Sequence, residues 1–141
     1  MSDFQAKASH TGRSFEQFVV GALDFYGWTV TGQRVVIDGM EIDIVANDPS
    51  GVEWLIECKG STGNRPGAQR SDTTKKAVGV AAHLRGGGEV RPYMLVTSHL
   101  PKPGSVSAQM LERAQALGWF DRVVSLGFGQ ADELIDDEVA S

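Results

Sequence analysis

The sequence predicts an α/β protein in which a mixed central sheet is flanked by helices. Segments with helical periodicity and segments with strand character follow one another in the order α-β-β-β-α-β-α-β. Clusters of glycine, proline and asparagine separate these segments, as expected for turns between regular elements. The apolar run at residues 93–96 is continuous, which is typical of a central strand buried on both faces. Such a sheet needs helices packed against it, and the predicted helices supply them.

The chain is predicted to begin its fold with a helix and a strand. Apolar residues recur at helical spacing over residues 15–26. Ser14 or Thr11 can cap the start of this helix, and Gly27 follows its end. Residues 28–36 come next and are rich in β-branched side chains, which predicts a strand.

Two further strands follow as a predicted hairpin. The dipeptide Asp38-Gly39 is a turn signal, and apolar and polar residues alternate over residues 40–45. Residues 47–51 form a second strong turn signal, and residues 52–59 continue as another strand.

The second half predicts two more helix–strand pairs. After a loop rich in glycine, proline and serine at residues 60–67, a helix is expected from about residue 71 to the glycines at 86–88. The buried strand at residues 92–98 follows. The chain then continues with a loop at 101–104, a helix at 106–117 closed by Gly118, and a last strand at 119–126.

Length and composition fit one globular domain. We expect a polar N-terminal segment at residues 1–12, a single domain at residues 13–128 and an acidic tail at residues 129–141. There is no apolar run of the roughly 18 residues that a membrane helix needs, and the start lacks the apolar stretch of a signal peptide. Cys58 is the single cysteine, and the three histidines lack zinc-site spacing. These features predict a cytoplasmic protein that contacts no membrane.

Two acidic residues and a lysine are predicted to converge on neighbouring strands. Glu57 and Lys59 are two residues apart in one strand, so their side chains point the same way. If Asp43 lies across from Glu57 in the hairpin, two carboxylates and an ammonium share one face. Two such carboxylates repel each other unless a cation lies between them, and Mg²⁺ or Mn²⁺ prefers oxygen ligands.

This convergence predicts a divalent-metal site for phosphodiester hydrolysis. We expect Asp43, Glu57 and the backbone carbonyl of Cys58 to ligate Mg²⁺ or Mn²⁺, which would polarise the scissile phosphate and activate water. Lys59 would hold that water or neutralise charge developing on the phosphate. The alternative is a surface ion pair between Glu57 and Lys59, the usual meaning of this spacing when it occurs alone. The neighbouring hairpin acid and the basic segment that follows favour the metal site.

The charge distribution favours a polyanionic partner although the net charge is −5. Of the 18 acidic residues, five lie in residues 131–141, which leaves 13 acidic against 13 basic residues in the rest of the chain. Residues 59–91 carry seven bases against only Asp72 and Glu89. A solvated helix face is the alternative, but the position directly after the candidate strand favours phosphate binding. The candidates for contact with the DNA backbone are Arg65, Arg70, Lys75 and Lys76.

Residues 39–46, Gly-Met-Glu-Ile-Asp-Ile-Val-Ala, and residues 54–59, Trp-Leu-Ile-Glu-Cys-Lys, resemble the motif of the PD-(D/E)XK nuclease superfamily. The resemblance is to small members such as Mrr-type restriction domains, archaeal Holliday-junction resolvases and YraN-like proteins. It implies the restriction-endonuclease-like fold, whose αβββαβ core matches the order predicted over residues 14–98.

The resemblance also implies residue roles. By position, Asp43 resembles the metal-binding Asp of the second core strand, Glu57 the second metal ligand and Lys59 the catalytic lysine. Glu16 fits the first-helix Glu that many members use at the site, and its alternative is an ordinary helix-surface acid. The proline of the family motif is absent here. Glu41, which stands near that place, is either an alternative ligand or a solvated acid.

The activity that the resemblance implies is that of a Mg²⁺- or Mn²⁺-dependent deoxyribonuclease, an endonuclease for duplex or branched DNA in repair, recombination or restriction. A homodimer acting on two strands is the arrangement that resolvases and restriction enzymes use. The alternative is a non-catalytic nucleic-acid-binding module of the same fold. The acidic tail either contacts a protein partner or limits non-specific DNA binding. His99 is expected to be a surface residue rather than a base.

Overall fold

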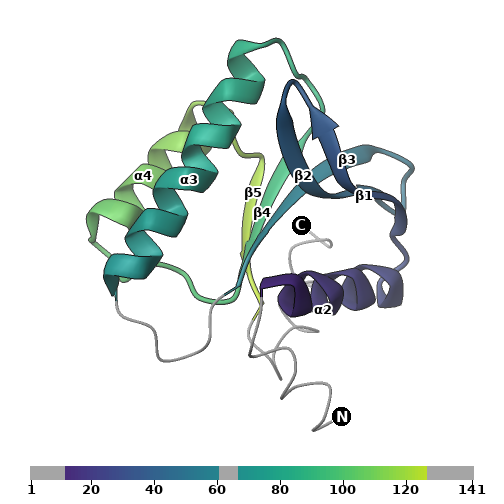
Figure 1. Cartoon of the computed structure of the whole chain (residues 1–141), viewed down its shortest axis with the longest axis horizontal. Helices are drawn as coiled ribbons and strands as arrows, with labels where there is room; N and C mark the ends of the chain where they lie inside the picture. Colours follow the sequence, from purple (N-terminus) through teal and green to yellow (C-terminus); the bar gives the residue numbers. More distant parts are fainter. Residues whose placement is uncertain (1–11, 61–66, 127–141) are drawn as a thin grey trace, which may run out of the picture.

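The computed structural model describes residues 12–60 and 67–126, and the side chains of residues 14–60 and 72–126. Thr11, the other residues of the N-terminal segment before residue 12, and the acidic tail at 129–141 lie outside the described residues. Helices and strands follow one another in the predicted order (Figure 1). They are α2 (Gly12–Phe25), β1 (Thr29–Ile37), β2 (Met40–Asn47), β3 (Glu53–Lys59), α3 (Gly67–Gly86), β4 (Tyr93–Thr97), α4 (Val106–Ala116) and β5 (Arg122–Ser125).

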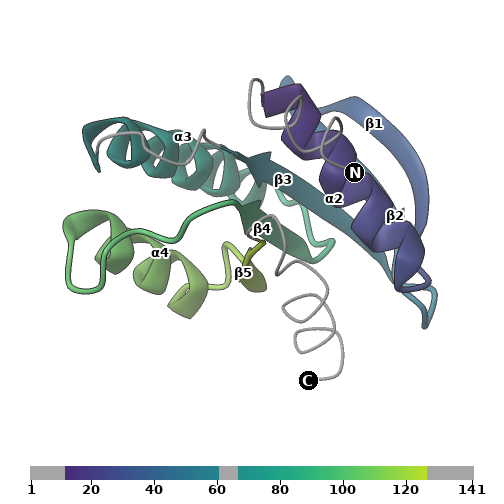
Figure 2. The ribbon, with the colours of Figure 1, turned by 90° about the horizontal axis from the view of Figure 1, so that it is seen from below.

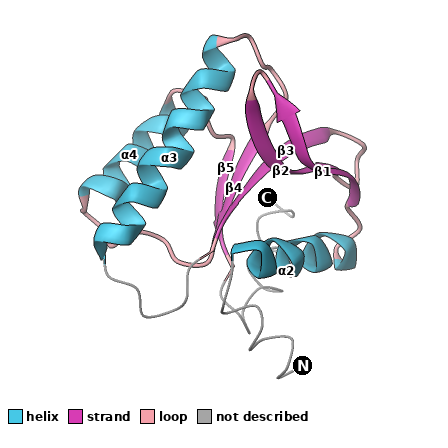
Figure 3. Ribbon diagram, in the orientation of Figure 1, coloured by secondary structure: helices cyan, strands magenta, loops and turns pink. Residues whose placement is uncertain are grey.

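The strands form one mixed sheet in the order β1-β2-β3-β4-β5 (Figure 3). β1, β2 and β3 pair antiparallel, whereas β3, β4 and β5 pair parallel. Every residue of β4 is buried, which confirms the central strand expected from the apolar run. The helices lie on both faces of the sheet (Figure 2). The α/β class and the αβββαβ order of the first six elements are therefore confirmed.

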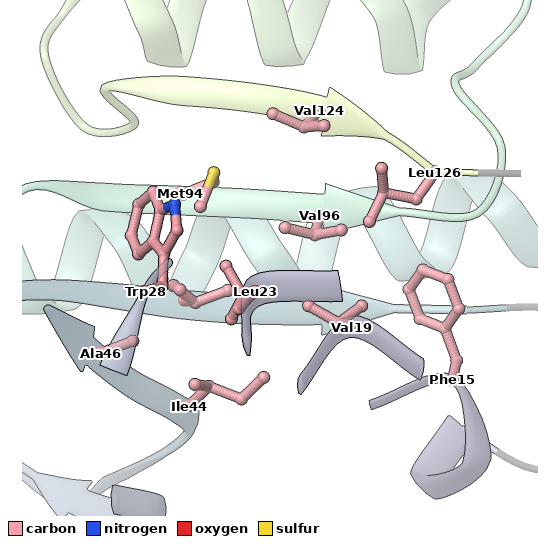
Figure 4. Close-up of a cluster of buried hydrophobic side chains, with 11 residues drawn as sticks. Phe15, Val19, Leu23, Trp28, Ile44, Ala46, Met94, Val96, Val124 and Leu126 are labelled. Carbon is pink, nitrogen blue, oxygen red and sulfur yellow. The ribbon is translucent and has the colours of Figure 1, made fainter. Parts of the chain in front are cut away.

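Each face of the sheet has its own hydrophobic core. On one face, α2 contributes Phe15, Val19 and Leu23, which pack with side chains of the strands (Figure 4). On the other face, α3 and α4 pack against each other and the sheet; their buried apolar residues are Ala77, Ala81, Leu84, Leu111 and Ala114. The alternation of side chains along the strands divides the apolar residues between these two cores.

Several element boundaries differ from those predicted. α2 begins at Gly12, so Ser14 lies inside the helix and does not cap it. α3 begins at Gly67 rather than near residue 71, because its first turn is polar and carries no apolar stripe that would reveal a helix. β5 is limited to Arg122–Ser125, the residues that pair with β4, and the carboxylate of the preceding Asp121 accepts a hydrogen bond from the N–H of Tyr93. No described helix is both long and apolar enough to cross a membrane.

The β1–β2 hairpin separates from β3 partway along β2. Pairing of β2 with β3 ends at Ile44 opposite Ile56, whereas pairing of β1 with β2 continues to Ile37 opposite Met40. The outer part of the hairpin is therefore a two-stranded arm. Asp43 is the first residue of β2 beyond the shared pairing, so it lies where the two strands part.

The tip of this arm contacts α3. The turn at its tip uses Asp38 and Gly39 with φ of 51° and 78°, the left-handed conformations that a tight hairpin turn favours. His83 Nε2 lies 3.0 Å from the carbonyl oxygen of Asp38 and 3.4 Å from its carboxylate. This contact holds the arm against the helix and so supports the position of the strand that carries Asp43.

Candidate active site

Asp43, Glu57 and Lys59 lie together where β2 and β3 part. The strand pairing stops one residue before Asp43 and Glu57, which would be the next opposed pair. Instead, Asp43 Oδ2 accepts a hydrogen bond from the backbone N–H of Cys58 at 2.8 Å. Lys59 Nζ lies 3.0 Å from Glu57 Oε2 on the same strand. The structure thus brings the two carboxylates and the lysine into one site, as their spacing in the sequence requires.

Glu57 holds its carboxylate in a buried position, and the residue is only 5% exposed. Burial is the largest cause that raises its pKa, the negative charge of Asp43 raises it further, and Lys59 partly offsets both, leaving the pKa at about 7. Oε1 is buried and has no hydrogen-bond partner among the described residues. A buried oxygen without a donor is costly, so this position suits a cation or a water molecule.

Asp43 is half-buried, and its side chain takes the place of a strand hydrogen bond. Burial raises its pKa, while the Cys58 N–H and the charge of Lys59 lower it by less, so the net shift is upward. Glu41 also raises the pKa of Asp43, although Glu41 itself is exposed. Its exposure favours the second of the two expectations for Glu41, a solvated acid near the site.

A third carboxylate reaches the site from α2. Glu16 is 5% exposed, which is unlike an ordinary helix-surface acid, and its charge contributes to the raised pKa of Glu57. Glu16 Oε1 accepts a hydrogen bond from Arg34 Nη2 of β1 at 3.3 Å. Arg34 also lowers the pKa of Asp43. One guanidinium therefore acts on carboxylates from two different elements.

Arg34 was not among the residues expected from the sequence. Its φ of 52° is in the left-handed region, which a non-glycine residue rarely adopts and which costs about 1–2 kcal/mol. The register of β1 shifts just before it, between Val30 and Gly32. The strained backbone and the ion pair with Glu16 together mark this arginine as part of the site. Neither the left-handed backbone nor the ion pair can be recognised from a single arginine in a strand sequence.

Replacing Arg34 by glutamine is expected to destabilise the protein by about 1–2 kcal/mol, because the buried Glu16 loses a charged hydrogen-bond donor. Urea unfolding of the single variants and of the Arg34→Gln/Glu16→Gln double variant measures this coupling. In the Glu16→Gln background the cost of Arg34→Gln should fall to a few tenths of a kcal/mol. Equal costs in both backgrounds would show that the two side chains do not depend on each other.

Gly60 allows α2 to approach the end of β3 closely. A Cβ at Gly60 would lie 2.5 Å from both Cβ and Cγ of Phe15, and Phe15 is itself buried in the core. Phe15 precedes Glu16 on α2, and Gly60 follows Lys59 on the strand. The missing side chain therefore lets one carboxylate of the site come from a helix and the others from the sheet.

The site offers a small set of oxygen ligands for a divalent ion. Within the described part of the chain, no three His, Cys, Asp or Glu side chains are grouped to hold a metal ion by themselves. Mg²⁺ is commonly bound through one or two carboxylates and keeps several water ligands. Asp43 and Glu57, with the buried Oε1 of Glu57, fit that smaller requirement, and the backbone carbonyl of Cys58 remains a predicted ligand.

The predicted DNA-binding bases are only partly within the described residues. Lys75 and Lys76 are exposed on α3. Arg65 lies outside the described residues, and so does the side chain of Arg70, whose backbone belongs to α3. Two exposed cations thus lie on the helix that follows the candidate catalytic strand.

No family model matches the sequence, and no curated protein matches it. The chain is similar to SfsA from Pyrococcus furiosus, solved in complex with Ca²⁺, with 18% sequence identity and a TM-score of 0.48. The similarity covers 82% of this chain and 55% of that one, so the chain spans about half the length of that protein.

Proposed function

We propose that this chain is a divalent-metal-dependent nuclease of the PD-(D/E)XK type that hydrolyses phosphodiester bonds in DNA. The buried carboxylate of Glu57 carries the proposal, because one of its oxygens contacts Lys59 and the other has no donor among the described residues. Asp43 adds a second negative charge beside it. Burial of like charges costs stability, and such arrangements are concentrated at functional sites. An ion pair with a purely structural role would need only Glu57 and Lys59, without the second carboxylate of Asp43.

The residues of the site have separate tasks in the proposed reaction. Asp43 and Glu57, with the Cys58 carbonyl, would hold Mg²⁺ or Mn²⁺, and the bound ion would polarise the phosphate and activate water. Lys59 would orient the attacking water and stabilise charge that develops on the phosphate oxygens. Glu16 would support the ion or the water from α2, and Arg34 would hold Glu16 in place. Lys75 and Lys76 would contact the DNA backbone.

Cleavage of a substrate panel tests the proposal. Supercoiled plasmid, linear duplex, single strand, flap and four-way junction are incubated with the protein and Mn²⁺, Mg²⁺ or EDTA. The wild type should cleave at least one substrate with metal and none with EDTA. Asp43→Asn, which can still accept from Cys58, and Lys59→Met should each be slower by about 100-fold or more. Lys102→Ala changes an exposed cation outside the site and should cleave at the wild-type rate.

The non-catalytic alternative predicts a different result. If the wild type shifts these DNA molecules in gels but leaves all of them intact with both metals, the chain is a binding module and the nuclease proposal fails. Cleavage that survives both Asp43→Asn and Lys59→Met would place the reaction elsewhere and would also reject the proposal.

Without metal, the free energy of unfolding should fall as the pH rises from about 5 to about 8. The pKa of Glu57 is about 7 in the folded protein against 4.5 for the free side chain, so the folded state holds this proton more tightly. The resulting stability is complete below pH 4.5 and is lost as the pH rises through 7. The shift corresponds to roughly 3 kcal/mol. Urea unfolding in EDTA measures it, and Mn²⁺ at the higher pH should restore stability by binding the ionised carboxylates.

A further inference from the structure

Tyr93, the first residue of β4, has a buried hydroxyl group that no described residue contacts. The residue is 0% exposed, and its ring packs against that of Phe120 with the ring centroids 5.2 Å apart. Its oxygen Oη is buried and has no hydrogen-bond partner among the described residues. Buried tyrosine hydroxyls are usually paired, because an unpaired one has lost its bonds to water without replacing them. The hydroxyl therefore needs a partner that the surrounding aromatic and aliphatic side chains do not supply.

Tyr93 and Glu57 point to the same face of the sheet from neighbouring strands. The parallel pairing of β3 and β4 puts Tyr93 opposite Leu55. Glu57 is two residues further along β3, opposite Leu95. Tyr93, Leu55 and Leu95 all belong to the core under α3 and α4, and alternation along β3 puts Glu57 on the same face as Leu55. Tyr93 and Glu57 are thus diagonal neighbours with backbones roughly 8 Å apart, within reach of long and aromatic side chains.

The two side chains carry complementary polar atoms. Oε1 of Glu57 is a buried acceptor that lacks a donor among the described residues, and a tyrosine hydroxyl is able to donate. Burial raises the pKa of Tyr93, and the negative charges of Glu57 and Asp43 raise it further. The hydroxyl therefore lies within electrostatic range of both carboxylates. Buried polar groups that do not touch each other are commonly joined by a buried water molecule.

Arg85 of α3 is the alternative partner for the hydroxyl. Its Nε is also buried without a hydrogen-bond partner among the described residues, and its positive charge lowers the pKa of Tyr93. This effect is smaller than the effects of Glu57 and Asp43. The guanidinium of Arg85 is also held already, by two backbone carbonyl oxygens and one carboxylate. The observations therefore favour the carboxylate of Glu57.

We propose that Tyr93 is a positioning residue whose hydroxyl group donates, through a buried water molecule, a hydrogen bond to Oε1 of Glu57. A carboxylate oxygen has two lone pairs, so Oε1 is able to accept this bond and still bind a metal ion. Groups that hydrogen-bond to a metal ligand fix its orientation and increase the affinity of the site for the ion. The proposal rests on the nuclease function proposed above, because it requires a divalent ion at Glu57.

Isothermal titration of the whole chain with Mn²⁺ tests this role. Tyr93→Phe removes only the hydroxyl and should weaken Mn²⁺ binding by about tenfold, the lower end of the range for partners of metal ligands. Tyr26→Phe makes the same chemical change at a half-buried position just after α2, away from the site, and should bind Mn²⁺ like the wild type. If Tyr93→Phe changes the melting temperature in EDTA but binds Mn²⁺ like the wild type, the hydroxyl is only structural and the inference is overturned.

A crystal structure of the wild type with Mn²⁺ gives a second test, which does not depend on the folding of a variant. A water molecule is expected within about 3.2 Å of both Tyr93 Oη and Glu57 Oε1. A water molecule shared with Arg85 alone, or none at Tyr93 Oη, would overturn the inference and leave the proposed function standing. A wild type that does not bind Mn²⁺ would overturn the proposed function, and this inference with it.

Discussion

Glu57→Gln is expected to stop cleavage while making the metal-free protein more stable. The variant removes a charge that would hold the metal, so the rate should fall by about 1000-fold. At about pH 8 it also removes an ionised carboxylate that is buried next to Asp43. The raised pKa of Glu57 shows that this ionised carboxylate lowers the stability of the folded protein. The free energy of unfolding should therefore rise by about 1–2 kcal/mol, because part of the gain is lost with the Lys59 ion pair. Plasmid cleavage and urea unfolding in EDTA measure the two effects.

Glu53→Gln is the matched control for this prediction. Glu53 lies on the same strand as Glu57 and shares its alternation, but its side chain is 45% exposed and pairs with Arg91. Its replacement should leave cleavage unchanged and should not raise stability at high pH. If Glu57→Gln lowers activity and raises stability while Glu53→Gln does neither, Glu57 behaves as a residue of a functional site. A Glu57→Gln variant that is less stable than the wild type at about pH 8, or that cleaves normally, would contradict this account.

The convergence of Asp43 with Glu57 and Lys59 could be predicted because it depends on local rules. Alternation along β3 puts Glu57 and Lys59 on one side, and the hairpin turn between β2 and β3 sets which residue of β2 stands opposite. The chain order of the elements followed in the same way from periodicity and turn residues. These properties depend on residues that are close in sequence, so one sequence was enough.

Features that depend on packing between distant elements could not be predicted in this way. Arg34 contacts Glu16 across 18 residues, and its left-handed backbone follows a register shift that no residue type announces. The hydrogen bond from the Ser98 N–H to the carbonyl oxygen of Lys59 depends on the parallel pairing of β3 with β4, which the predicted element order allowed but did not specify. The metal and the reaction stay predictions, because they depend on groups that bind to the site.

Gly60→Ala is expected to damage both stability and cleavage, although glycine-to-alanine changes often stabilise proteins. The new Cβ would lie 2.5 Å from Cβ and Cγ of Phe15. Rotation of the Phe15 ring cannot relieve a contact that involves its Cβ, so α2 or the end of β3 has to move. We expect a loss of about 2–3 kcal/mol, as for other overpacked cores. Because Glu16 and Lys59 are neighbours of the two clashing residues, kcat should also fall by about 100-fold.

Gly21→Ala separates this steric effect from the general effect of alanine on α2. Gly21 is on the same helix, and a Cβ there meets no atom within 4 Å. Alanine in a helix interior is favoured over glycine by roughly 0.5–1 kcal/mol, so this variant should be more stable and should cleave DNA like the wild type. A loss of stability in Gly60→Ala together with a gain of stability in Gly21→Ala would show that α2 must approach β3 closely to complete the site. Wild-type stability and cleavage in Gly60→Ala would show instead that the helix can shift without cost, and that Glu16 is not needed at its present position.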